Sequence, residues 1–121
     1  MRMREPFASS LWLAFVLASG SVSAEPVKLQ GEVVDLSCYL GRGASGPDHA
    51  ACAERCIASS RVAGFRDGDG TVYLLLQAPD APPPAELVSG LAGMPVEIEG
   101  TATERDGFRA FRITRARMLE P

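Results

Sequence analysis

The sequence predicts a small, mostly β domain that carries one helical insertion and follows an export signal. Five segments rich in β-branched and aromatic residues are separated by Asp-Gly and Pro-rich stretches, a pattern typical of short strands joined by tight turns. All three cysteines and the only histidine fall between the first two of these segments. The chain therefore divides into a leader, a β-rich domain and a cysteine–histidine insertion within that domain.

Residues 1–24 have the features of a secretory signal peptide. Two arginines precede the apolar run Leu11–Ala18, and Val22 and Ala24 supply residues suited to positions −3 and −1 of a cleavage site. The apolar run is shorter than the roughly 20 residues that a membrane-spanning helix needs. We expect cleavage after Ala24; the alternative is an uncleaved signal anchor.

Cleavage there leaves residues 25–121, a single domain of 97 residues whose net charge changes from −3 to −4. A negative domain is not a general nucleic-acid binder. We assign the arginines of the last predicted hairpin to a solvated strand face: Arg105, Arg109, Arg112, Arg115 and Arg117. No later segment is apolar enough to cross a membrane. We expect a soluble protein in an oxidising compartment, the bacterial periplasm, or a secreted one.

The first half of the domain contains three predicted strands. The first covers Val27–Asp35, and Gly31 within it predicts a β-bulge. A helical insertion then occupies about 36–60. The second and third strands follow at Arg61–Arg66 and Thr71–Gln77, joined by an Asp-Gly-Asp-Gly turn whose residues tolerate positive φ.

The second half contains a short helix and two more strands. Consecutive prolines lead into a helix over Ala85–Leu91. The strand Pro95–Glu104 alternates cleanly, which places three residues on one face: Val96, Ile98 and Gly100. An Asp-Gly turn precedes the last strand, Phe108–Met118.

This element order predicts the fold. Apart from the insertion, the order is β-β-β-α-β-β, which is the order of the oligonucleotide/oligosaccharide-binding (OB) fold, a five-stranded, partly open barrel. Closing so small a sheet into a barrel also removes its exposed edges. The alternative is an open meander with two helices on one face.

The insertion holds the candidate functional residues: Cys38, His49, Cys52 and Cys56. A helix that begins near Pro47, behind a Ser45 or Gly46 cap, aligns the last three on one stripe about 60° wide. Glycines allow Cys38, at the end of the first strand, to fold back over that stripe. Three thiolates and an imidazole complete a tetrahedral Zn²⁺ site, whereas thiolates alone suit Cu⁺. We predict a metal-binding protein for copper or zinc, in which the cluster either handles the ion, with transfer to a periplasmic protein partner, or forms a structural metal site.

Two other interpretations of the cluster remain open. Small exported domains often contain a disulfide, and a bond from Cys38 to either Cys52 or Cys56 would staple the helix to the first strand of a structural or interaction module. Such a bond leaves one thiol beside His49, which is also compatible with thiol redox chemistry. The sequence shows no Ser-His-Asp arrangement, and we do not expect an enzyme.

Three segments of the chain resemble a family of small exported bacterial proteins. They are Gly31–Tyr39 (Gly-Glu-Val-Val-Asp-Leu-Ser-Cys-Tyr), His49–Cys56 (His-x-x-Cys-Ala-x-x-Cys) and Val72–Leu75 (Val-Tyr-Leu-Leu). The resemblance covers most of the predicted mature chain. It implies an OB-like domain in which the Cys/His cluster is the functional feature, and it specifies neither a reaction nor a metal.

Overall fold

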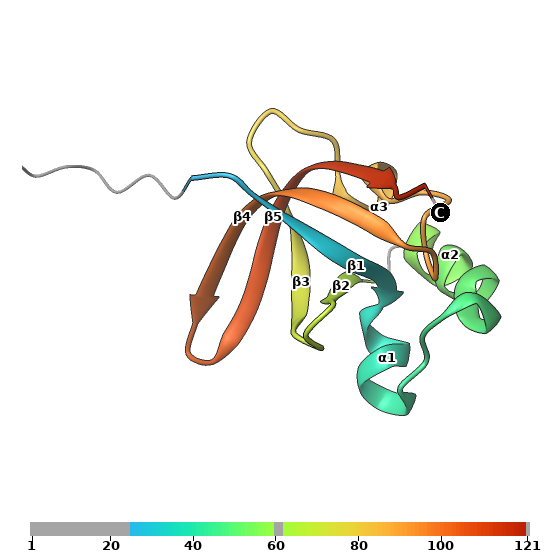
Figure 1. Cartoon of the computed structure of the whole chain (residues 1–121). Coiled ribbons are helices and arrows are strands. Elements are labelled where there is room, and N and C mark those ends of the chain that lie inside the picture. Colours follow the sequence, from blue (N-terminus) through green and yellow to red (C-terminus); the bar gives the residue numbers. More distant parts are fainter. Residues whose placement is uncertain (1–24, 60–61, 121) are drawn as a thin grey trace, which may run out of the picture.

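The computed structural model describes residues 25–59 and 62–120, so the predicted leader lies outside the described residues. These ranges form a mostly β structure with five strands: β1 Val27–Asp35, β2 Ala63–Asp67, β3 Val72–Gln77, β4 Val96–Arg105 and β5 Phe108–Met118. Three α-helices and one 3₁₀ turn accompany them (Figure 1): α1 Leu36–Arg42, η1 Pro47–His49, α2 Ala50–Ala58 and α3 Pro84–Leu87.

The strands pair in the order β1-β2-β3-β5-β4, and the order closes because β4 also pairs with β1. The first half of β1 pairs with β4 and the second half with β2, both antiparallel. Strands β3 and β5 are parallel, and β4 and β5 form a long hairpin. Strand β1 therefore belongs to both halves of a closed sheet, and it ends beside the helices α1 and α2 (Figure 1).

The predicted bulge at Gly31 is wrong. Strand β1 keeps a regular register with β4 up to Gly31 and with β2 from Gly31 onwards, whereas the register shift lies between β4 and β5 at Glu99/Gly100. Gly31 is needed for close approach instead, because a Cβ atom there would overlap the carbonyl oxygen of Arg66 on β2. The glycine marks the point where β1 changes partner.

The helices differ more from the predictions than the strands do. The insertion begins with α1, which was not predicted, and continues through η1 into α2. Helix α3 ends at Leu87 rather than at Leu91. Gly90 then adopts a φ of 79°, in the left-handed region that is incompatible with a continuing helix.

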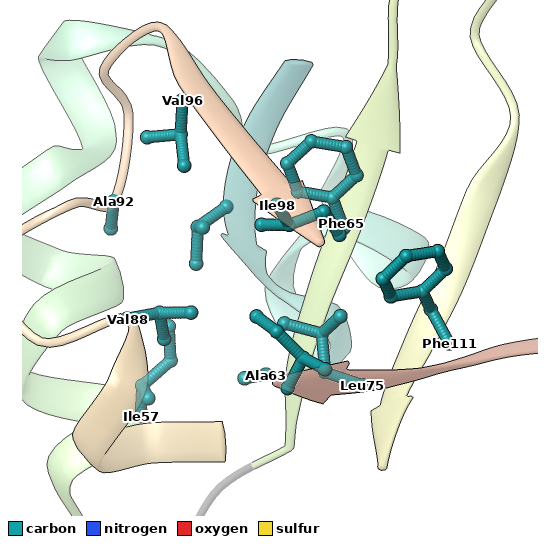
Figure 2. Packing of buried hydrophobic residues seen from close by; sticks show 11 residues of the cluster. Ile57, Ala63, Phe65, Leu75, Val88, Ala92, Val96, Ile98 and Phe111 are labelled. Carbon is teal, nitrogen blue, oxygen red and sulfur yellow. The ribbon is translucent and has the colours of Figure 1, made fainter. Parts of the chain in front are cut away.

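The core lies inside the sheet and extends towards the insertion. Figure 2 shows Phe65 and Phe111 packed near Ile98, with Ile57 of α2 on the opposite side of the cluster. The alternation predicted for β4 is confirmed, because Val96, Ile98 and Gly100 are all buried. In the described ranges no helix is long and apolar enough to cross a membrane. Helix α2 is thus packed against the barrel through its own core residue.

We expect Gly31→Ala to lower the free energy of unfolding by about 2–3 kcal/mol, because the added methyl group must displace the backbone of β2. The matched control is Gly41→Ala on α1, where an added Cβ meets nothing within 4 Å. That control should be neutral or stabilising by up to about 1 kcal/mol, since alanine favours a helix. Urea denaturation measures both, and equal stability of the two variants would contradict the close approach at Gly31.

Candidate metal centre

Asp35 forms the junction between the barrel and the insertion. It is the last residue of β1, paired in register with Ala63 of β2, and it is also the N-cap of α1. Its side chain accepts a hydrogen bond from the backbone N–H of Cys38 at 2.8 Å, which satisfies one of the free donors of the first turn. This cap fixes Cys38 in the first turn of α1, directly above the end of β1.

Helix α2 is brought to the same place by the loop that precedes it. Gly46 caps η1, with Pro47 at its first position as predicted, and the backbone N–H of Gly46 donates to the carboxylate of Glu32 on β1. A Cβ at Gly93 would lie 2.7 Å from the carbonyl oxygen of Gly46. The start of the helical segment is therefore held against the barrel on two sides.

Two residues of α2 itself fix the helix on the barrel. Ile57 is buried in the core at 3% exposure. Glu54 accepts hydrogen bonds from the backbone N–H groups of Gly90 and Ala92, each at 2.8 Å. Carboxylate–amide bonds of this kind are stronger than neutral ones. They hold Cys52 and Cys56 in a defined position relative to α1.

The ligand atoms of Asp35, Cys38 and Cys56 all lie within 4.8 Å of one another. Next to them is a cavity of about 10 Å³, which is roughly the space that one water molecule occupies. Three of the predicted ligands line this cavity together with Asp35: Cys38, His49 and Cys52. The structure thus brings Cys38 and Cys56 together with Asp35, whereas His49 and Cys52 line the adjacent cavity and lie outside the close group of ligand atoms.

His49 departs from the predicted stripe. It ends η1 and stands at the N-cap position of α2, with φ −106° and ψ 1°, so the helical spacing that relates Cys52 to Cys56 does not extend to it. Its side chain is exposed, whereas those of the three cysteines are half-buried. In the described residues, His49 lines the cavity but stays outside the close group of ligand atoms.

The three cysteines are free thiols in this structure. The sulfurs of Cys38 and Cys56 belong to the close group, so of the two predicted disulfide pairings this one has a short distance to support it. Burial, together with the neighbouring Cys52 and Cys38, raises the pKa of the Cys56 thiol. A reactive redox thiol needs a lowered pKa, because the thiolate is the nucleophile.

Arg42 adds a positive charge at the rim of the cluster. Its Nη2 donates a hydrogen bond to the sulfur of Cys38 at 3.5 Å. This hydrogen bond and the Coulombic interaction with Cys38 raise the pKa of Arg42. The guanidinium comes from the last turn of α1, one turn beyond Cys38, where a cation is also favoured by the helix dipole.

Sequence reasoning missed Asp35 as a member of the cluster. The signal was present, because an aspartate three residues before Cys38 follows a run of strand residues and can cap a helix. The strand pattern that ends at Asp35 predicts no helix directly after it, so the sequence does not identify Asp35 as the cap of α1. Because Asp35 ends β1 and also caps α1, its carboxylate lies beside Cys38, the third residue of that helix.

We expect Glu54→Gln to lower the free energy of unfolding by about 1–2 kcal/mol, because one of two charge-assisted hydrogen bonds is lost. The control is Glu120→Gln, which removes an equal charge from an exposed position and should change stability by less than about 0.5 kcal/mol. Urea denaturation compares the two variants. A loss no larger than that of the control would mean that α2 is held by Ile57 alone.

Comparisons of the chain with protein-family models, with curated proteins and with solved structures found no match.

Proposed function

We propose that the chain is an exported, periplasmic metal-binding protein that handles copper or zinc through Cys38, His49, Cys52 and Cys56. The observation that carries the proposal is the convergence of a carboxylate oxygen and two sulfurs within 4.8 Å, beside a cavity large enough for one ion. Thiolate, imidazole and carboxylate groups are the ligands that zinc and related metals take in proteins.

The scaffold that we propose is an OB-type barrel. The closed strand order and the helix between β3 and β4 support this assignment. The insertion leaves the barrel after β1 and returns at β2, and residues that bind ligands are often carried by connecting segments on a rigid sheet. The barrel in this proposal is the support, and the insertion is the binding element.

Partial exposure of the cluster supports ion transfer rather than a permanent structural role. The three thiols are half-buried, and His49 and Arg42 are exposed beside them. An ion at this point is reachable by a ligand from a second protein, whereas a sealed site would release its metal only on unfolding. We propose a periplasmic protein partner that exchanges the ion through this open side.

A second candidate function is supported by the short distance between the sulfurs of Cys38 and Cys56. In an oxidising compartment these two residues could close a disulfide that staples α2 to the end of β1. The protein would then be a structural or interaction module without a metal. Cys52 would be its remaining free thiol.

We expect mature protein purified from a periplasm without chelators to contain about one zinc or copper ion per chain and three alkylatable cysteines. Native and denatured intact masses, with elemental analysis of the same sample, measure both quantities. The double variant Cys38→Ser/Cys56→Ser should lose the ion, whereas Ser37→Ala, an exposed neighbour on α1, should keep it. Circular dichroism checks that both variants retain their strands.

Two results would contradict the metal proposal. One is a mass two hydrogen atoms below that of the reduced chain, with no metal and one alkylatable thiol, which would establish the disulfide. The other is an unchanged metal content in the double variant, which would place the ion elsewhere on the chain.

Export is tested by the N-terminus of the product. We expect the protein recovered from the periplasm to begin at Glu25, because Val22 and Ala24 fit a signal-peptidase site. N-terminal sequencing and intact mass identify this end. Replacing Ala24 with a bulky residue such as phenylalanine should slow processing, and a product that keeps residues 1–24 in the wild type would instead indicate a signal anchor.

A further inference from the structure

Asp35 is unusual among the charged residues of the described chain because it is buried. Its exposed fraction is 1%, and no other polar or charged residue in 25–59 and 62–120 is classed as buried. Its Oδ1 accepts the hydrogen bond from the N–H of Cys38. Its Oδ2 is also buried and has no hydrogen-bond partner among the described residues. The helix cap therefore uses one oxygen of this carboxylate, Oδ1, and leaves Oδ2 without a partner.

An unpartnered buried carboxylate is costly, and native proteins compensate such charges with an opposite charge or a metal ion. The described ion pairs do not include Asp35. Arg42, which stands close to the cluster, donates to the sulfur of Cys38 instead. No Lys, Arg or His of the described residues therefore forms an ion pair with Asp35 within 4 Å.

Two sulfur atoms of the kind that bind a metal lie close to this carboxylate. The Asp35 oxygen, the Cys38 sulfur and the Cys56 sulfur lie within 4.8 Å of one another. Around zinc, with bonds of about 2.0–2.3 Å, tetrahedral ligand atoms lie roughly 3.3–3.8 Å apart. Small side-chain rotations thus bring the three atoms to bonding distance. The adjacent cavity leaves His49 or Cys52 to provide a fourth ligand.

We propose that Asp35 is itself a metal ligand, together with Cys38 and Cys56, and that it makes the site selective for a divalent zinc-like cation over Cu⁺. This inference rests on the proposed metal-binding function. A carboxylate oxygen is a hard donor that zinc accepts, whereas Cu⁺ prefers sulfur alone. One carboxylate and two thiolates also compensate a divalent charge better than a monovalent one.

The competing explanation gives Asp35 only the structural role of capping α1. That role uses Oδ1 alone, and asparagine and serine cap helices about as well as aspartate. Asp35→Asn therefore keeps an oxygen for the N–H of Cys38 and removes the negative charge. Asp35→Ser does the same with a smaller side chain. The two roles can thus be separated without removing the cap.

The test uses the full mature chain and measures affinity for Zn²⁺ and for Cu⁺ by chelator competition. We expect Asp35→Asn to weaken zinc binding by at least about 100-fold, since altering even the outer contacts of a metal site costs about 10–100-fold. Its affinity for Cu⁺ should stay within about threefold, because thiolates alone bind that ion. The matched control is Asp48→Asn, an equal charge change at an exposed position near His49, which should alter neither affinity by more than about threefold.

The stabilisation by zinc provides a readout that a purely structural role would not produce, because only a metal ligand changes how far zinc raises the unfolding temperature. Without metal, Asp35→Asn should unfold at a higher temperature than the wild type, because the unpaired buried charge is gone. On addition of zinc, the unfolding temperature of the wild type should rise far more than that of the variant. If Asp35→Asn fails to fold, Asp35→Ser is measured in the same way, and if neither variant folds, Asp35 is essential to the cap and the ligand assignment is rejected.

The outcomes separate this inference from the function on which it rests. Equal zinc affinity in Asp35→Asn and the wild type overturns the ligand role while metal binding stands. Tighter binding of Cu⁺ than of zinc under competition in the wild type overturns the selectivity and leaves a copper protein. A wild type that binds neither ion removes the proposed function, and the inference with it.

Discussion

The arrangement of the cluster depends on one hydrogen bond, from the backbone N–H of Cys38 to the carboxylate of Asp35. The strand gives way to the helix at this one residue, since Asp35 is both the last residue of β1 and the cap of α1. The neighbouring bond from Leu36 N–H to the carbonyl oxygen of Val62 holds the same turn against the start of β2. Without this junction, Cys38 would have no fixed position relative to α2. The position of the thiol is thus set by backbone geometry rather than by packing of its own side chain.

The opposite side of the cluster depends on the hydrophobic core. Cys56 and Ile57 are adjacent on α2, so burying Ile57 under the barrel determines the direction in which Cys56 points. Glu54 adds a polar clamp one turn earlier. The site therefore lies between one element fixed by a cap and another fixed by core packing. Such independent supports keep ligands within the narrow tolerances that metal binding requires.

The sequence predicted the sheet better than the helices. β1 and β5 have the predicted bounds, and β4 begins and ends one residue later than expected, because alternation and Asp-Gly turns are strong local signals. Helix α1 lacked such a signal, because its seven residues are too few to show a helical repeat and the Asp35 that caps it also ends β1. The residue types of the site were visible in the sequence. That Asp35 can cap a helix beside Cys38 was visible too, but its proximity to Cys56 follows only from the three-dimensional approach of α2 to the end of β1.

The pairing of Asp35 with Ala63 has a consequence for how this protein could have diversified. These two residues are register partners on neighbouring strands, so the insertion leaves and re-enters the barrel at points only about 5 Å apart. A segment with such closely spaced ends can change in length at little cost, since each doubling of its length costs only about 0.6 kcal/mol of closure entropy. One restriction applies, because Ile57 fills part of the core. A replacement segment must therefore supply an apolar side chain that fills the space of Ile57.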